Sequence, residues 1–140
     1  IAATASEKYI IKKYDSIEKL DKKAPFVVSS EITKLKTKQI LEELKMILGN
    51  LYGVAIKEKS IRAGKGKLRG RKYKSTAGMI LVLGREEMLK TKLFEVKNVR
   101  ELGVTDLAKG GLGRVAVYTE NAIKELENKL GGNKKWILNL

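Results

Sequence analysis

Nine cations lie within a single eighteen-residue segment of this chain, at positions 57–74. They are Lys57, Lys59, Arg62, Lys65, Lys67, Arg69, Arg71, Lys72 and Lys74. Because Glu58 is the only acid there, the segment carries a charge of +8, more than half of the chain's net +14. Cations at this density repel one another in water, and they bind a polyphosphate favourably because it releases condensed counterions. The segment therefore predicts a flexible, glycine-rich loop that contacts the phosphate backbone of a nucleic acid.

The residue types between these cations support the same interpretation. Gly64, Gly66 and Gly70 allow turns and positive φ angles that other residues disfavour. Arginine side chains present planar forks that suit bidentate phosphate contacts and stacking on bases, and Tyr73 adds an aromatic face. The alternative is a solvated loop with no partner. The mixture of arginine with an aromatic ring favours nucleic-acid contact over that alternative.

The composition excludes several classes of function. The chain has no cysteine and no histidine, which excludes disulfides, thiol nucleophiles, histidine bases and the usual nitrogen or sulfur zinc sites. A length of 140 residues with 43% hydrophobic content predicts one folded domain over residues 1–132, followed by a tail at 133–140 with no assigned role. No apolar run reaches the length of a membrane span. The first residue is Ile1 rather than methionine, so we expect a fragment or a processed product.

The first half of the sequence predicts two helices and a strand. Residues 2–13 favour a helix with Ala2, Ala5, Tyr9 and Lys13 on one side, and residues 26–28 favour a buried strand. A second helix has an apolar stripe and ends at Gly49; the stripe is Ile40, Leu41, Leu44, Ile47 and Leu48.

Three lysines are expected in the opening turns of the second helix, at the positive end of its macrodipole: Lys34, Lys36 and Lys38. A bound phosphate or ordinary solvation would relieve this conflict equally well.

The second half predicts three more strands. Residues 79–83 are apolar throughout, which is typical of a central parallel strand. Residues 86–93 favour a short helix, 94–99 a strand, 103–113 a loop or single helical turn, and 115–118 a fourth strand. Thr119 is expected to cap a helix over 120–130 with a buried stripe of Ile123, Leu126 and Leu130. The order predicts an α/β fold: a mainly parallel, Rossmann-like sheet of about four strands with helices on both faces.

Enzymatic motifs are weak in this sequence. Residues 111–116 match the letters of G-x-G-x-x-A, but they lead into a strand instead of opening a helix, so they do not predict a dinucleotide site. Asp106 and Glu120 are candidates for a general base or a metal ligand. We favour structural roles for both: Asp106 in a turn or cap, and Glu120 in the first turn of a helix.

The segment 61–73 resembles the signature of universal large-subunit ribosomal protein four, the "L four" family, in its archaeal and eukaryotic form. The resemblance continues in order through residues 1–5, 25–28, 36–38, 80–83, 101–107 and 118–122, and covers about residues 1–130. Two features depart from the family. Its N-terminal strand and its long basic extension toward the nascent-peptide tunnel precede the part that matches Ile1, and residues 92–96 replace a short asparagine-containing turn.

The resemblance implies a non-enzymatic constituent of the cytoplasmic large ribosomal subunit that supports subunit assembly and translation. It implies contact with ribosomal RNA and neighbouring ribosomal proteins, and neither a cofactor, a small-molecule substrate nor a membrane. The implied RNA-binding residues are Arg62, Gly64, Lys65, Gly66, Lys67, Arg69, Gly70, Arg71, Lys72, Tyr73 and Lys74, with Lys36 and Lys38 at the helix entry. Two alternatives stay open: a free-standing RNA-binding or regulatory module, and a small metal-dependent nucleotide or RNA enzyme.

Overall fold

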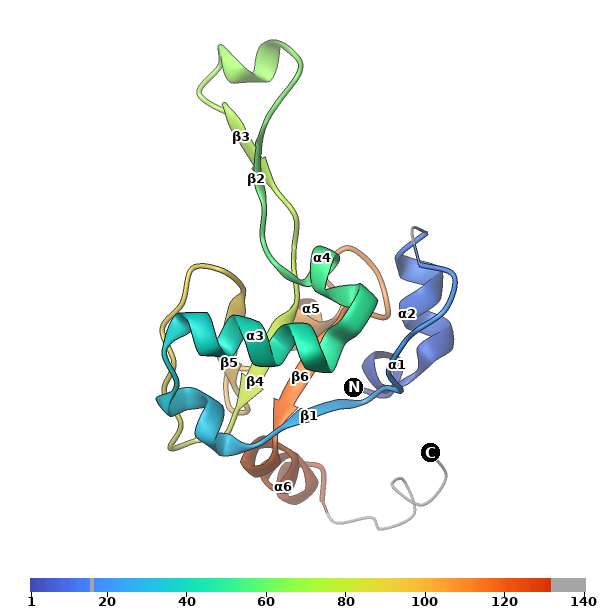
Figure 1. The fold of residues 1–140 in the computed structure, drawn as a ribbon, viewed down its shortest axis with the longest axis vertical. Coiled ribbons are helices and arrows are strands. Elements are labelled where there is room, and N and C mark those ends of the chain that lie inside the picture. The colour runs from blue at the N-terminus through green and yellow to red at the C-terminus, as the bar shows by residue number, and fades with distance from the viewer. Residues whose placement is uncertain (16, 132–140) are drawn as a thin grey trace.

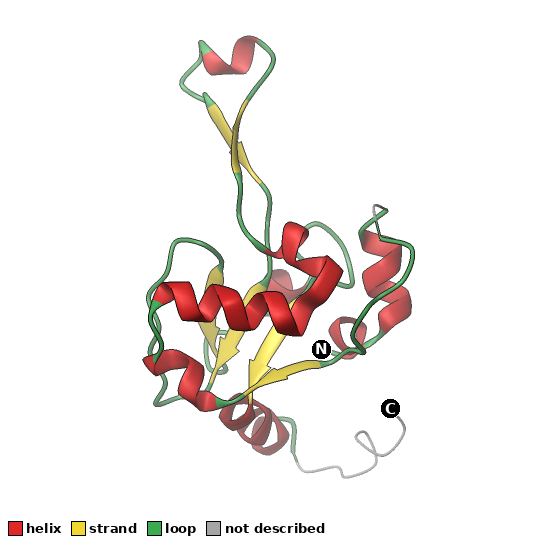
Figure 2. Ribbon diagram, viewed as in Figure 1, coloured by secondary structure: helices red, strands yellow, loops and turns green. Residues whose placement is uncertain are grey.

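Four parallel strands form the central layer of the computed structural model, which describes residues 1–15 and 17–131 (Figures 1 and 2). The strands are β1 (Phe26–Val28), β4 (Ile80–Leu83), β5 (Glu95–Asn98) and β6 (Ala116–Thr119), in the order β1-β6-β4-β5. In register, Ile80 lies opposite Ala116 on one side and Glu95 on the other. The predicted parallel α/β sheet is therefore confirmed.

The central position of β4 follows from its composition. All four of its residues are buried, because helices cover both faces of the sheet. Successive side chains of a strand point to opposite faces, so Leu81 and Leu83 join one hydrophobic cluster while Ile80 and Val82 join the other. At the sheet edge, β1 buries Phe26 and Val28 but leaves Val27 exposed. The predicted burial of that strand is thus correct for one face only.

Helices on the two faces complete three layers. On one face lie α2 (Glu7–Lys13) and α3 (Thr37–Leu48), and on the other lies α6 (Glu120–Lys129). The shorter elements are α1 (Ala2–Ala5), α4 (Tyr52–Ala55), α5 (Val104–Leu107), the 3-10 turns η1 (Ser30–Lys34), η2 (Gly49–Leu51) and η3 (Lys65–Lys67), and the strands β2 (Lys59–Ile61) and β3 (Tyr73–Ser75).

Two predicted helix caps are confirmed. Gly49 ends α3 with φ +52°, a conformation that favours glycine. Thr119 precedes α6, and its Oγ1 accepts the backbone N–H of Ala122 at 3.3 Å. The predicted single turn within the glycine-rich segment is also present, as α5.

Residues 2–13 are helical as predicted, but they do not form one continuous helix. The segment is split in two at Ser6, which is extended at φ −102° and ψ 120°. The buried residues are Thr4 and Ile10 rather than the stripe expected from residues 2, 5, 9 and 13. Thr4 is buried because its hydroxyl has partners inside the protein. It donates to the carbonyl of Ile1 at 2.7 Å and pairs with the Tyr118 hydroxyl at 2.7 Å.

The short helix expected at residues 86–93 was also wrong, since that described segment is irregular. Glu87 is buried, and its carboxylate accepts the Gly84 N–H at 2.8 Å, the Thr119 hydroxyl at 2.6 Å and the Asn121 amide at 3.0 Å. These bonds hold the chain in a turn that competes with a helix. Burial by itself would raise the pKa of Glu87, but the hydrogen bonds outweigh it and the pKa is lowered.

Two smaller corrections concern helix faces. In α6 the buried residues are Ala122 and Leu126, while Ile123 and Leu130 of the expected stripe are exposed. Lys34 belongs to η1, so only Lys36 and Lys38 stand at the start of α3.

Gly113 tests the packing of α2 on the sheet. It has φ +81°, and a Cβ at this position would overlap the carbonyl group of Tyr9. We expect Gly113→Ala to lower the free energy of unfolding by about 1–3 kcal/mol or more, because both the backbone angle and the contact become strained. Urea denaturation measures this loss. The control Gly53→Ala, in α4 with open space around the site, should be neutral or stabilising; equal losses in both variants would contradict the packing described here.

Candidate nucleic-acid interface

Residues 59–75 form a β-hairpin that projects from the body of the molecule, here called the basic arm (Figure 1). Its strands β2 and β3 are antiparallel, with Lys59 opposite Ser75 and Ile61 opposite Tyr73. The N–H of Arg62 extends the ladder by donating to the carbonyl of Lys72 at 2.9 Å. The sequence predicted a flexible loop, and this prediction is corrected. The two short strands were not recognised among the cations and glycines, because each contains only one residue that favours strands, Ile61 in β2 and Tyr73 in β3.

The tip of the basic arm is a tight turn. Gly66 accepts backbone N–H groups from Arg69 at 3.2 Å and from Arg71 at 3.0 Å. Gly70 has φ +73°, whereas Gly64 is extended at φ −88°. Among Gly64, Gly66 and Gly70, for which positive φ angles were expected, only Gly70 therefore adopts one.

The cations of the basic arm face solvent. All residues from 59 to 75 are exposed except Gly66, which is half-buried. Eight of the seventeen are cations and none is an acid. Within the described ranges, the salt bridges are those of Lys109 and Arg114 with Glu95, and neither involves the arm. The positive charge of the arm is thus available to an external polyanion.

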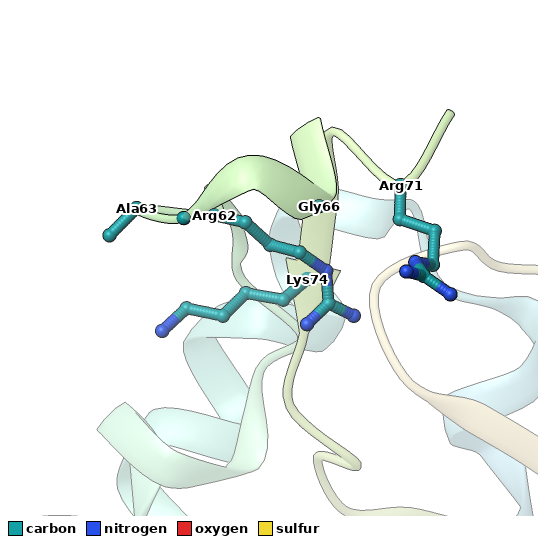
Figure 3. A pocket seen from close by; sticks show the side chains of 6 residues that line it. Arg62, Ala63, Gly66, Arg71 and Lys74 are labelled. Atoms are coloured by element: carbon teal, nitrogen blue, oxygen red, sulfur yellow. The ribbon is translucent and has the colours of Figure 1, made fainter. Parts of the chain in front are cut away.

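An open hollow of about 540 Å³ lies at the tip of the arm (Figure 3). Its cations are Arg62 from one leg of the hairpin and Arg71 and Lys74 from the other. The remaining lining residues are Ala63, Gly64 and Gly66, so small residues leave the guanidinium groups accessible. This arrangement can surround phosphate groups with donors from two sides.

Apolar and aromatic side chains are interleaved with the charges of the basic arm. Tyr73 is half-exposed, and the Nζ atoms of Lys59 and Lys72 lie 5.3 and 5.6 Å from the centre of its ring. Leu68 at the tip is 82% exposed, and Ile61 is 58% exposed. The sequence reasoning missed these two residues, although an apolar side chain within a cationic glycine-rich segment was a usable signal for contact with bases or ribose.

Lys36 and Lys38 lie apart from the basic arm. They stand at the first turn of α3, whereas the arm follows the last turn of α3 by way of η2 and α4. The twelve residues of α3 span about 18 Å. The side-chain oxygen of Gln39 accepts the Lys36 N–H at 3.1 Å, so the protein itself satisfies one donor at this helix end. The structure does not bring these lysines together with the other predicted site residues.

Arg114 holds the base of the arm and is fully buried. Its Nε donates to the carbonyl of Gly78 at 3.0 Å, and its Nη2 donates to those of Ala77 at 3.0 Å and Met79 at 3.3 Å. These three residues lie between β3 and the central strand β4, one residue after β3 ends. The guanidinium group therefore fixes the segment through which the arm returns to the sheet.

The same guanidinium joins two further elements to this base. Its Nη1 donates to the carbonyl of Asp106 in α5 at 2.6 Å, and its Nη2 lies 2.8 Å from Oε2 of Glu95 in β5. Lys109 reaches the same oxygen at 3.3 Å. Burial by itself would raise the pKa of Glu95, but the hydrogen bonds and charges of Arg114 and Lys109 outweigh it, so the pKa lies below its ordinary value of 4.5.

Backbone hydrogen bonds fix both legs of the arm to the body. The N–H of Lys57 donates to the carbonyl of Leu93 at 2.9 Å, and that of Met79 donates to the carbonyl of Ala55 at 2.7 Å. Gly78, which precedes Met79, has φ +65°, and a Cβ at this position would lie 2.8 Å from the carbonyl oxygen of Ala55. The sequence reasoning did not identify Arg114 as a structural residue, because nothing in its neighbours shows that five acceptors converge on it.

The candidate catalytic carboxylates have structural roles, as predicted. Asp106 accepts the N–H of Gly103 at 3.0 Å and so closes the first turn of α5. Glu120 is the first residue of α6. The G-x-G-x-x-A letters lead into β6, as expected. Within residues 1–15 and 17–131, no three acidic, histidine or cysteine side chains come together in a way that could hold a metal. None of the helices described there is long and apolar enough to cross a membrane.

Comparison with curated proteins gives relatives that share one name, Large ribosomal subunit protein uL4. The relative from Methanosphaera stadtmanae is 32% identical over 142 residues, which cover 96% of this chain and 54% of the relative. The one from Saccharolobus islandicus is 35% identical over 139 residues, covering 93% and 52%, and the one from Candida albicans is 33% identical over 141 residues, covering 95% and 39%. The chain thus spans about half the length of the first two relatives and less of the third. No protein-family model matches the chain.

Arg114→Met tests the anchor of the basic arm. We expect it to lower the free energy of unfolding by about 3–5 kcal/mol, because four carbonyls and Glu95 lose a buried donor. Urea denaturation followed by circular dichroism measures the change. Arg100→Met is the matched control, since Arg100 is exposed, and it should change stability by no more than about 0.5 kcal/mol. A loss below 1 kcal/mol for Arg114→Met would show that the guanidinium is not an anchor.

Glu95→Gln tests the charge at this anchor. Because the folded-state pKa of Glu95 is lowered, its stabilising effect is complete above pH 4.5 and disappears as the pH falls through the folded-state pKa. We expect the variant to be less stable by about 1–2 kcal/mol at pH 7 and to lose less stability than the wild type on acidification. Unfolding free energies at pH 7 and pH 3 give both values. Glu127→Gln, at an exposed position of α6, serves as the control. The expectation fails if Glu95→Gln loses as much unfolding free energy between pH 7 and pH 3 as the wild type and the control do.

Proposed function

We propose that this chain, which belongs to the uL4 family, is a structural constituent of the large ribosomal subunit. In this proposal it binds ribosomal RNA through the basic arm and catalyses no reaction. One observation carries the proposal: eight cations without an acid stand on an exposed hairpin whose base is anchored in the core. Membership of the family rests on relatives that are 32–35% identical and carry the uL4 name.

The shape of the arm supports contact with folded RNA. A two-stranded hairpin is narrow, with strands about 4.8 Å apart, so it can enter between RNA strands and present cations on both sides. Lysine and arginine contacts to phosphates position the protein and carry little sequence information. RNA shape and 2′-hydroxyl groups would then determine the site. The side chains of Tyr73 and Leu68 add faces on which unpaired bases or riboses can pack.

The proposed RNA-binding residues are those of the arm. They are Arg62, Gly64, Lys65, Gly66, Lys67, Arg69, Gly70, Arg71, Lys72, Tyr73 and Lys74. Lys36 and Lys38 are proposed as a second, separate contact at the start of α3. The remaining surface would meet neighbouring proteins of the large subunit, and the site of action would be the cytoplasmic ribosome during subunit assembly and translation. The proposal needs no cofactor and no small-molecule substrate.

Salt dependence of RNA binding tests the role of the arm. If about five of its cations meet phosphates, log affinity should fall against log salt concentration with a slope of about −3.5 to −4.5. The triple variant Arg62→Gln, Arg71→Gln, Lys74→Gln removes the cations of the hollow. We expect it to reduce the magnitude of the slope by about 2–3, as measured by filter binding to large-subunit RNA between 50 and 300 mM salt.

The control for this experiment removes the same charge elsewhere. Lys22→Gln, Lys45→Gln and Lys124→Gln lie on exposed positions outside the arm, and together they should leave the slope nearly unchanged. Equal effects of the two triple variants would mean that only net charge matters, which would overturn the proposed site. Strong RNA binding without co-sedimentation with large subunits in high-salt gradients would favour a free-standing RNA-binding module.

A further inference from the structure

The two faces of the basic arm differ in chemistry. Residues directly opposite each other in an antiparallel pair lie on the same face, and neighbours along a strand point to opposite faces. Because Ile61 lies opposite Tyr73 and Ser60 lies opposite Lys74, the first pair occupies one face and the second pair the other. We call the first of these the Ile61–Tyr73 face. It faces solvent, with Ile61 58% exposed and Tyr73 51% exposed.

The cations of the tip hollow belong to the other face of the arm. Arg62 continues the alternation after Ile61, and its N–H bonds to the carbonyl of Lys72 in the next rung of the ladder. Arg62 and Lys74 line the hollow, whereas neither Ile61 nor Tyr73 does (Figure 3). A phosphate group bound in the hollow therefore leaves the Ile61–Tyr73 face uncovered.

We propose that the Ile61–Tyr73 face binds an unpaired nucleobase, stacked on the ring of Tyr73, from the same RNA whose phosphates contact the cations of the arm. This inference rests on the proposed function and adds the class of RNA to it, a helix interrupted by unpaired nucleotides. Tyr73 is the only aromatic residue in the sequence of the arm, so any stacking on the arm depends on this one ring. Bases within a helix are stacked on one another, and only an unpaired base can turn outward to meet a side chain.

The charges around the Tyr73 ring favour a nucleotide over an apolar protein surface as the occupant. The Nζ atoms of Lys59 and Lys72 lie 5.3 and 5.6 Å from the centre of the ring, and the sequence of the arm contains no acid. An apolar surface laid on this face would remove two ammonium groups from water without a counter-charge, which is unfavourable. A nucleotide brings its own phosphate group, which can pair with them.

The two lysines do not prevent a base from stacking. Each of them makes its cation–π contact at an exposed position, where such a contact is weaker than the stacking of a base on an aromatic ring. A base can therefore replace one ammonium group over the ring, and the displaced lysine has a flexible stem that can reach the phosphate of the same nucleotide. Ile61 extends the apolar surface beside the ring, because the Cβ atoms of an opposed pair are about 5 Å apart.

Three RNA hairpins test this inference: one that is fully paired, one with a bulge of unpaired adenosines, and one in which the same bulge consists of abasic riboses. The abasic bulge keeps the phosphates and the flexibility of the second hairpin but lacks its bases. At one salt concentration, we expect the chain to bind the adenosine bulge about tenfold more tightly than the abasic bulge, because the loss of one stacked base costs roughly that factor. Filter binding measures the affinity for each hairpin.

Variants of Tyr73 test whether its ring causes this preference. Tyr73→Leu removes the ring but keeps a large apolar side chain, and it should reduce the preference to less than about twofold. Tyr73→Phe keeps the ring and should keep most of the preference. Tyr9→Leu is the matched control, because Tyr9 is a 43% exposed tyrosine of α2, outside the arm, and it should leave the preference unchanged. Circular dichroism checks that all three variants are folded.

Equal affinity of the wild type for the two bulges would overturn the inference, and the Ile61–Tyr73 face would then be left to a neighbouring protein. A preference that Tyr73→Leu retains would also overturn it, since the ring would not be the cause. Neither outcome contradicts the proposed function if the fully paired hairpin still binds with the salt dependence expected for phosphate contacts. Failure to bind any of the three hairpins would overturn the proposed function and the inference together. The comparison of the two bulges uses the unaltered chain, so it does not depend on whether a variant folds.

Discussion

The buried guanidinium group of Arg114 is the interaction on which the rest of the structure depends. It collects the carbonyls of three consecutive residues after the basic arm, one carbonyl of α5, and the carboxylate of Glu95. Removing an arginine from water costs several kcal/mol, and only complete pairing offsets that cost. Since its acceptors lie on three separate elements, the pairing is complete only when the arm base, α5 and β5 are all in place. The group thus couples the arm to the core.

This coupling matters because the basic arm has little stability of its own. Its two strands pair over three residues each, and an isolated two-stranded hairpin is marginal in water. Eight like charges add repulsion along its length. The anchor at Arg114 and the backbone bonds of Lys57 and Met79 therefore determine where the arm points, and a polyanion removes the repulsion when it binds. A highly charged element on a fixed base is suited to binding a preformed RNA surface.

The sequence was sufficient for the parts of the fold that depend on local pattern. The unbroken apolar run around β4 predicted the central strand, and Gly49 and Thr119 marked helix ends correctly. The family was also identified from the arginine and glycine signature, and the uL4 relatives confirm it. Long-range pairing was not readable. The helix expected around Glu87 does not form, because this side chain bonds to residues more than thirty positions away in the sequence. In the same way, the acceptors of Arg114 come together only in the folded chain.

The most direct test of the account is a map of the contacts between this chain and large-subunit RNA. Ultraviolet crosslinking of the complex, followed by digestion and mass spectrometry, identifies the peptides that touch nucleotides. The account predicts that crosslinks concentrate within residues 59–75, with Tyr73 and the residues lining the tip hollow among them. Crosslinks confined to the body of the protein, with peptides of the arm recovered unmodified, would contradict it.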